Sequence, residues 1–352
     1  MWWDRIKGWP AIIRLLNWEY WPAYAFYWPL VLFYYPYLSL KAGHWCFFTA
    51  ANPGIETGGL GAEPKIDTIR KIPGPYRPKS TLILAGTPFR EVRRRLFATG
   101  IEYPLIAKPN VGFRGILVKK IGSEDQLEAY LDTHPVDFIL QEFIDLPSEI
   151  GVLYYRFPEE EEGTITSLTL KEFLSIQGDG QSTVLELIER KARARLQLDR
   201  FRRDRPHLLD KVPEEGVELS LGSIGNHNLG TRFIDANHLI DDRLRRIFDG
   251  LFLQLEGVCY GRLDIKCRDL EDLKAGGHFV ILEINGVCSE PTHMYDPRRN
   301  TYFGALREIL RHWSVIYRLS MENHRRGAGF MPAREMLGRL YRLWRYLGIG
   351  NW

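Results

Sequence analysis

Two short apolar segments in the last third of the chain carry charged and polar residues at alternate positions. Residues 261–267 read Gly-Arg-Leu-Asp-Ile-Lys-Cys, and residues 279–285 read Phe-Val-Ile-Leu-Glu-Ile-Asn. Both are typical of core β-strands, in which alternate side chains point to the same face. Charges inside such strands are costly unless they are paired or bind a ligand. Two pairs of residues then share a face: Arg262 with Asp264, and Glu283 with Asn285.

These two pairs predict a metal site if the two strands are neighbours. Two carboxylates, an amide oxygen and a cation would then face one space. Such oxygen ligands suit Mg²⁺, with Mn²⁺ as a substitute, bound together with substrate phosphates. We therefore expect Asp264, Glu283 and Asn285 to be metal ligands, and Arg262 to stabilise a phosphoryl group in transfer. A purely structural salt-bridge network is the alternative.

The chain around these strands reads as mixed α/β. Apolar segments predict strands at residues 104–109, 116–121, 137–144 and 165–174. Lys108 lies at the end of the first strand and is followed by a loop that contains Gly112 and Gly115. A lysine and the N–H groups of a glycine turn can bind nucleotide phosphates. The loop lacks the GxxxxGK[ST] pattern of a P-loop.

In chain order, these residues resemble the ATP-grasp superfamily. The order is Lys108-Pro109, the glycine loop, Gln141-Glu-Phe-Ile144, Glu149, Lys171, Arg262-x-Asp264 and Glu283-x-Asn285. The resemblance covers residues 100–300. It is closest to the carboxylate–amine ligases that include D-alanine–D-alanine ligase and glutathione and cyanophycin synthetases. It implies an α+β fold in which two α/β subdomains clamp ATP.

The resemblance also implies a role for each matching position. Lys108 and Lys171 would contact the phosphates of ATP, and the loop at residues 110–115 would close over them. Arg262 would steady an acyl phosphate. The remaining positions divide into an adenine hinge, a ribose contact and ligands for two Mg²⁺ ions. These are, respectively, Gln141, Phe143 and Ile144; Glu149; and Asp264, Glu283 and Asn285. In many relatives, the Gln141 position holds Glu.

The implied reaction activates a carboxylate with ATP. Transfer of the γ-phosphoryl group gives an acyl phosphate, which an amine or thiol then attacks, so that ADP and phosphate are released. Two other functions stay open. One is an ATP-grasp kinase that phosphorylates a hydroxyl group. The other is a membrane-attached nucleotide-binding scaffold without turnover.

The substrate side has weaker signals. Polar loops at residues 223–232 and 287–296 flank the metal strands, and they supply four candidates to bind an acid or orient an amine. These are His227, Arg232, Glu290 and His293. Residues 47–100 are too few for the N-terminal substrate domain of the ligases. We therefore expect residues 46–103 to form a short substrate or lid region, and we carry no D-alanine specificity over.

The N-terminus is unusually aromatic. Seven of the ten Trp residues lie within the first 45 residues, and residues 21–40 carry no charge. That uncharged run is long enough to cross a bilayer. However, Pro22, Pro29 and Pro36 interrupt helical hydrogen bonding, and Trp and Tyr prefer the headgroup level. We expect residues 1–45 to dip into a membrane surface; a single span near 21–40 and a packed soluble segment are the alternatives.

The C-terminal residues 321–352 carry six Arg and two Glu. On a helical wheel, one face is apolar and consists of Ala333, Met336, Leu337, Leu340, Tyr341, Leu343, Trp344 and Leu347. The other face carries Arg334, Arg339, Arg342 and Arg345. A basic amphipathic helix of this kind is attracted to an anionic membrane surface. A surface helix packed on its own domain is the alternative. The catalytic domain would then span residues 104–320.

Composition narrows the partners and the compartment. The chain has 47 Lys and Arg against 44 Asp and Glu, a net charge of +3, so charge does not indicate a nucleic-acid partner. Four scattered cysteines without metal-ligand spacing fit a reducing cytosol. We expect a cytoplasmic enzyme at the inner membrane leaflet, acting on small or amphiphilic carboxylate and amine substrates.

Overall fold

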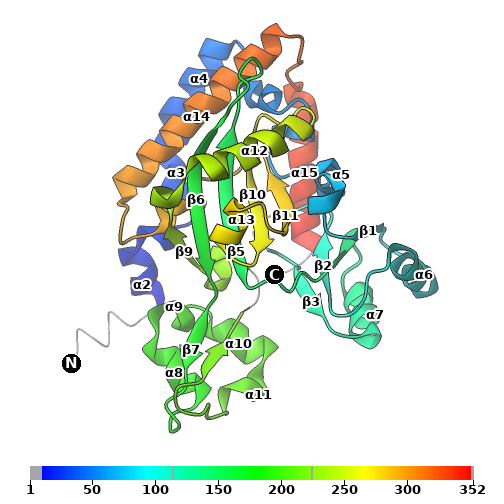
Figure 1. The fold of residues 1–352 in the computed structure, drawn as a ribbon, viewed down its shortest axis with the longest axis vertical. Helices are drawn as coiled ribbons and strands as arrows, with labels where there is room; N and C mark the ends of the chain where they lie inside the picture. The colour runs from blue at the N-terminus through cyan, green and yellow to red at the C-terminus, as the bar shows by residue number, and fades with distance from the viewer. Residues whose placement is uncertain (1–9, 113–114, 223–224, 350–352) are drawn as a thin grey trace.

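The computed structural model describes residues 10–112, 115–222 and 225–349. Its largest unit is a five-stranded antiparallel sheet in the order β11-β10-β5-β6-β9 (Figure 1). The strands are β5 (Ser148–Tyr155), β6 (Thr164–Glu172), β9 (Arg232–Asp235), β10 (Tyr260–Cys267) and β11 (Phe279–Asn285).

Alternation along these strands gives the sheet two different faces. Leu263 and Ile265 of β10 and Val152 of β5 pack against the helix α12 (Asp242–Gln254). The side chain of Phe248, on this helix, is fully buried. On the opposite face, the β10 end near Tyr260 packs against α14 (Tyr302–Arg325). The polar residues of β10 and β11 lie further along that second face. Short elements at the sheet edge are α13 (Leu270–Lys274), α5 (Lys65–Lys71), η5 (Gly74–Tyr76) and η7 (Asn237–Leu239).

A second, four-stranded sheet has the order β1-β4-β2-β3 and is also antiparallel. It consists of β1 (Ser80–Ile83), β2 (Leu105–Pro109), β3 (Lys119–Ile121) and β4 (Phe138–Glu142), with helices α6 (Phe89–Thr99) and α7 (Glu124–Thr133). The helix α7 begins at Glu124, because the Ser123 hydroxyl accepts a hydrogen bond from the N–H of Gln126 and so caps the first turn. The two sheets and their helices confirm the predicted α+β class.

A small third unit extends from the far end of β6 and has its own core around Phe201. Figure 1 shows it at the bottom of the molecule. It contains a two-stranded sheet and four short helices: β7 (Ser175–Gln177), β8 (Glu218–Ser220), α8 (Val184–Arg190), α9 (Ala192–Arg195), α10 (Leu198–Asp204) and α11 (Pro206–Leu209).

The aromatic N-terminus folds into short helices beside α14 (Figure 1). These are α2 (Pro10–Leu16), η1 (Trp18–Tyr20), α3 (Ala23–Pro29), η2 (Leu30–Tyr34) and α4 (Tyr35–Ala42). The last three follow one another without a gap. Between Pro29 and Pro36, the Tyr35 N–H donates a hydrogen bond to the carbonyl oxygen of Leu30, five residues back. This spacing makes η2 a π-helical turn. Among the described residues, no helix combines the length and apolar content needed to cross a bilayer.

The segment after these helices is buried rather than open. It contains η3 (Phe47–Ala51) and η4 (Glu56–Gly58), and Asn52 in it bonds to the backbone of Tyr260 on β10. Gly59 comes so close to Gly286, just after β11, that a Cβ atom there would lie 2.5 Å from the Gly286 Cα. This part of residues 46–103 therefore packs as core against the end of β11, while Leu60 and Lys65 of the same region line the cavity described below. The role of residues 46–103 as a substrate or lid region stays a prediction.

The C-terminal helix α15 (Ala333–Ile349) forms where the sequence predicts it. Its predicted apolar face is divided, however. Met336 and Leu343 are buried, whereas Leu337 and Trp344 are exposed. Arg339, expected on the polar face, turns inward and forms an ion pair with Glu56. All four cysteines are free, and of these Cys46 and Cys267 are buried.

Candidate active site

The two motifs that the sequence singled out lie side by side. In the antiparallel pair β10 and β11, Asp264 is opposite Glu283 and Arg262 is opposite Asn285. The two strands are therefore neighbours, which is the condition on which the predicted metal site depends, and all four side chains share one face. That face is turned away from the apolar core under α12, so the charged groups meet one another instead of hydrocarbon.

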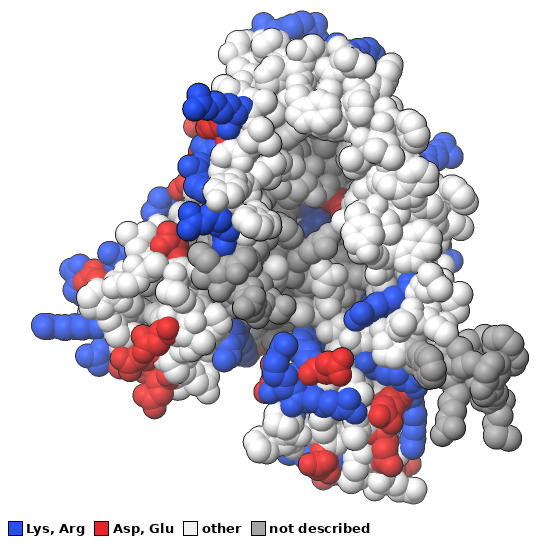
Figure 2. Space-filling view, turned by 180° about the vertical axis from the view of Figure 1, so that it is seen from behind, with Lys and Arg blue, Asp and Glu red and all other residues white. Residues whose placement is uncertain are grey.

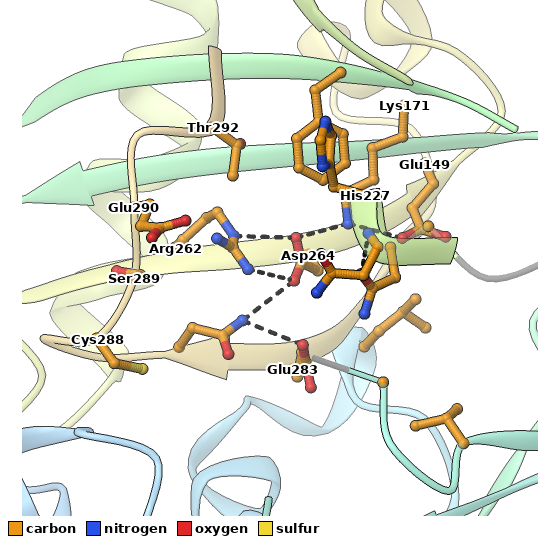
Figure 3. A pocket seen from close by; sticks show the side chains of 18 of the residues that line it. Glu149, Lys171, His227, Arg262, Asp264, Glu283, Cys288, Ser289, Glu290 and Thr292 are labelled. Atoms are coloured by element: carbon orange, nitrogen blue, oxygen red, sulfur yellow. Dashed lines mark hydrogen bonds and ion pairs between the residues drawn. The ribbon is translucent and has the colours of Figure 1, made fainter. Parts of the chain in front are cut away.

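Asp264 lies at the centre of a hydrogen-bonded network (Figure 3). The Arg262 guanidinium donates to both of its carboxylate oxygens, at 3.3 and 3.2 Å. The Asn285 amide donates to Asp264 Oδ2 at 3.2 Å and to Glu283 Oε1 at 3.2 Å. Asp264 is only 5% exposed, so each of these contacts lies in a poorly hydrated space.

Two lysines complete the charge balance of this network. Lys171 of β6 donates to Glu149 Oε1 at 2.8 Å and to Asp264 Oδ1 at 2.9 Å, and its side chain is 4% exposed. Lys65, at the start of α5, lies 3.1 Å from Glu283 Oε2. The sequence did not reveal Lys65, because no local motif marks it and its partner is 218 residues away.

Burial and charge shift the pKa values of these groups in opposite directions. Burial lowers the pKa of Lys108 to about 8. Burial also acts to lower the pKa of Lys171, but Asp264 and Glu149 outweigh it and raise that pKa above its ordinary value. Burial acts to raise the pKa of Glu283, yet Lys65 and Lys108 hold it well below its usual range. The network therefore favours the charged forms of Glu283 and Lys171.

The set of donor atoms suits a hard cation that takes some of its oxygen ligands from the protein and the others from phosphates. Among the described residues, no group of three His, Cys, Asp or Glu side chains is placed to hold a metal alone. What converges is two carboxylates and one amide, with Arg262, Lys171 and Lys65 balancing the negative charge. Such a set fits Mg²⁺ that takes its remaining oxygens from substrate and water.

The predicted nucleotide residues line the same cavity, which lies between the two sheets and has a volume of about 480 Å³. Lys108 Nζ donates to Gln141 Oε1 at 3.0 Å and to the oxygen of Leu282 at 3.2 Å, so it joins β2, β4 and β11. Glu149, predicted to bind ribose, is engaged by Lys171 here, and its ribose role stays a prediction. The predicted residues that line the cavity from this side are Lys108, Gly115, Gln141, Phe143, Ile144, Glu149 and Lys171. Gly112 is outside that lining.

Two of the four substrate candidates reach the cavity. His227 and Glu290 line it. Arg232 and His293 do not: Arg232 pairs with Glu172 on the neighbouring strand, and His293 is buried in the turn η8 (Thr292–Tyr295) with its backbone N–H on Ser167. The structure thus brings together most, but not all, of the residues that the sequence proposed.

The aromatic N-terminus supplies the remaining wall, which the sequence did not reveal. Trp18, Trp21, Phe26 and Tyr27 line the cavity. Glu19 fixes this segment over the site, because it pairs with Arg193 of α9 at 2.7 Å and with His227, in the turn η6 (His227–Leu229), at 3.1 Å. Figure 2 shows the molecule from behind, with a hollow whose upper rim carries few charges. One face of a segment predicted to contact membrane therefore faces the site.

The fold resembles solved ligase structures at low sequence identity. The chain matches VanG D-Ala:D-Ser ligase from Enterococcus faecalis with a TM-score of 0.42 and 14% identity, over 75% of this chain and 64% of that one. It matches D-alanine–D-alanine ligase from Bacillus anthracis with a TM-score of 0.41 and 14% identity, over 76% and 70%. A bifunctional glutathione synthetase from Pasteurella multocida gives 0.36 and 13%, over 70% and 35%.

No family model and no curated protein matches the chain. The chain spans just under two thirds of the length of VanG.

Proposed function

We propose that this protein is an ATP-dependent ligase that joins a carboxylate to an amine. The observation that carries the proposal is the network of Lys171, Arg262, Asp264, Glu283 and Asn285, buried where two sheets meet. A network that served stability alone would gain little from so many buried charges, since their desolvation offsets most of their attraction. Binding of a triphosphate and its metal would account for these buried charges.

ATP would lie between the two sheets. Lys108 and Lys171 would bind its phosphates, and Gln141, Phe143 and Ile144 would contact the adenine. Asp264, Glu283 and Asn285 would hold Mg²⁺, which offsets phosphate charge when it is bound. Arg262 and the lysines are fixed before substrate arrives, so little reorganisation is needed when charge develops.

The residues suit a two-step reaction. A substrate carboxylate oxygen forms a bond to the γ-phosphorus as the bond to ADP breaks. The resulting acyl phosphate has a carbon that an amine can attack, because its negative charge is masked. The new C–N bond forms, phosphate leaves with the bonding electrons, and the amine loses its proton. Arg262 would hold the substrate oxygens in both steps, and the aromatic wall would exclude water.

We also propose that the enzyme works at the cytoplasmic surface of a membrane. The outer side of α3, η2 and α4 exposes Tyr24, Trp28, Leu32, Phe33 and Leu40, each by more than half. The adjacent helix α14 carries exposed arginines, among them Arg307, Arg311 and Arg318. An apolar ridge beside a row of cations is complementary to anionic lipid. In Figure 2, most of the upper part of the molecule is uncharged surface, with Lys and Arg side chains at its outer edge.

Hydroxylamine trapping tests the ligase proposal. Purified protein is incubated with MgATP, hydroxylamine and a panel of carboxylates, and both ADP and hydroxamate are measured. We expect ADP and hydroxamate in equal amounts with the right acid, and neither with Asp264→Asn. Glu128→Gln, which changes an exposed acid on α7, is the matched control and should behave as wild type. Release of ADP without hydroxamate, upon addition of a hydroxyl compound, would indicate a kinase and contradict the proposal.

A further inference from the structure

The wall formed by the N-terminal helices is aromatic and continuous with the turn η8. Trp18 stacks on Phe26 and on Tyr295, with ring centroids 5.8 and 5.9 Å apart. Phe26 and Tyr295 are themselves 6.3 Å apart. All three rings line the cavity that contains Arg262 and Asp264. This end of the cavity therefore offers flat apolar surfaces to a substrate.

One carboxylate within this wall is held in place by phenol hydroxyls. Glu290 accepts hydrogen bonds from the Tyr27 hydroxyl on one oxygen and from the Tyr295 hydroxyl on the other, the latter at 2.8 Å. Among the residues that the structure describes, no lysine, arginine or histidine forms an ion pair with it. Burial, and then Glu290, raise the pKa of Tyr27 well above its usual range, so the phenol remains a donor.

Glu19 is a second carboxylate in this part of the cavity, and its partners differ from those of Glu290. Glu19 lines the same end of the cavity, but Arg193 and His227 satisfy its charge. Arg262 is the cation near Glu290, and Figure 3 shows the two side chains beside each other. The guanidinium of Arg262, however, is hydrogen-bonded to both oxygens of Asp264. Glu290 is thus oriented by two phenols, and among the described residues no lysine or arginine forms an ion pair with it.

A partly buried carboxylate between aromatic rings is costly unless a cation joins it. Aromatic faces also attract cations, because of their negative quadrupole. The two features together select a ligand with a positively charged group attached to an apolar body. Figure 2 shows a hollow whose upper rim carries few charged residues, on a face whose lower part carries many.

We infer that the acceptor substrate is a primary amine carried on an apolar skeleton, with Glu290 as the binding group for its ammonium and the rings of Trp18, Phe26 and Tyr295 as the contact for its body. The inference rests on the proposed ligase function, because it assigns the amine of that reaction. It leaves two sources for the same chemistry: a soluble arylalkylamine, or a long-chain amine presented by a membrane.

Binding measurements without turnover test this assignment. Calorimetry in the presence of ADP and Mg²⁺ compares phenethylamine with the uncharged 2-phenylethanol and the anionic 3-phenylpropanoate. We expect wild type to bind the amine and to bind the other two far more weakly. Glu290→Gln should weaken the amine by about 10- to 100-fold, since a charge-assisted contact is lost. Tyr27→Phe should weaken it less, because Glu290 keeps one phenol.

Controls separate a lost contact from a lost fold. ADP affinity and the melting temperature are measured for each variant, and both should match wild type in Glu290→Gln. Glu290→Asp, which keeps the charge, should recover part of the amine affinity. Glu128→Gln should change nothing. If Glu290→Gln melts early, Tyr27→Phe decides the matter alone: unchanged amine affinity in that variant would overturn the assignment.

A second arm identifies the source and separates this inference from the proposed function. Anionic phospholipid vesicles that contain a long-chain amine are compared with vesicles of the same phospholipid without that amine, to which free phenethylamine is added. Binding that requires the vesicle amine indicates the membrane source, and binding of free phenethylamine indicates the soluble one. Hydroxamate formation together with equal affinity for amine and alcohol would overturn the inference but keep the ligase. Absence of hydroxamate with every acid would overturn the ligase itself.

Discussion

Lys171 Nζ lies 2.9 Å from Asp264 Oδ1, and this contact joins two strands that are not neighbours in the sheet. β5 lies between them and contributes Glu149, 2.8 Å from the same nitrogen. One lysine therefore balances two carboxylates from two strands. A metal ion, or a phosphate with its metal, that binds Asp264 must therefore displace Lys171 from Asp264 or bind beside it.

Replacement of Lys171 should affect stability and turnover together. Lys171→Met leaves Glu149 and Asp264 buried without their shared cation, so we expect a loss of about 3 kcal/mol in the free energy of unfolding. ADP formation should fall by about 100-fold, because a fixed cation at the phosphates is lost. Urea unfolding and an ADP assay measure the two effects.

The matched control is an exposed ion pair. Arg243 contacts Asp241 and Glu271, and all three side chains are at least 36% exposed. Arg243→Gln should cost less than about 1 kcal/mol and leave turnover unchanged. Equal effects of the two substitutions on stability would show that the Lys171 network is screened by water, contrary to its burial.

Strand periodicity made the polar face of β10 and β11 predictable. On a strand, residues two positions apart must share a face, so Arg262 with Asp264 and Glu283 with Asn285 could be placed from sequence alone. The order of motifs supplied Lys108 and Lys171. Lys65 escaped, because only the tertiary fold brings it to Glu283, and nothing near it in sequence announces a site.

The N-terminal helices show a different limit. Hydrophobicity reports that a side chain avoids water, but it does not say whether lipid or protein replaces that water. Phe26 and Leu30 are buried against the domain, whereas Leu32 and Phe33, close by in the sequence, are exposed. One aromatic segment thus has a face buried against the domain and an exposed face, and composition did not tell these two faces apart.

ATP affinity should depend on the protonation of Lys108. Its pKa is lowered to about 8, so the side chain loses its positive charge as the pH rises above that value. We therefore expect ATP affinity to be constant near pH 7 and to fall above pH 8, by up to about 10-fold per pH unit. Lys108→Arg keeps its charge over this range and should flatten the profile. Calorimetric titration from pH 7 to 9.5 measures it; a flat wild-type profile would contradict the assignment.

The close approach of Gly59 and Gly286 should make Gly286 intolerant of a side chain. A Cβ atom on Gly286 would lie 2.4 Å from the oxygen of Gly58 and 2.7 Å from the Cα of Gly59. Both neighbours are backbone atoms, so Gly286→Ala should cost about 1–3 kcal/mol and lower turnover through Asn285. Gly250→Ala, in an exposed turn of α12 with no atom within 4 Å, should instead stabilise by about 0.5–1 kcal/mol. Thermal melting compares them, and a loss no larger in Gly286→Ala would refute the packing argument.

His312 should contribute to acid sensitivity. Burial lowers its pKa from 6.5 to about 3, and its ring bonds to the Tyr260 hydroxyl at 2.9 Å. Below pH 6.5 the unfolded chain binds a proton that the folded chain refuses, so stability is lost as the pH falls from 6.5 towards 3, by up to about 1.4 kcal/mol per pH unit. His312→Gln should lose less over the same interval. Urea unfolding at pH 7, 5.5 and 4.5 measures the slopes, and identical slopes would exclude His312 as the cause.

The exposed ridge on α3, η2 and α4 should bind anionic vesicles. Phe33 on η2 is 69% exposed and Phe97 on α6 is 91% exposed, which gives a matched pair of substitutions. Burial of a phenylalanine in the interface contributes about 1.5–3 kcal/mol, so Phe33→Ser should weaken vesicle binding by at least about 10-fold. Phe97→Ser should leave binding unchanged, because α6 lies on the other lobe (Figure 1). Co-sedimentation at low salt measures both. Full recovery of wild type in the supernatant, or an equal loss in both variants, would rule out this ridge as the docking surface, because only a specific apolar contact distinguishes two exposed phenylalanines.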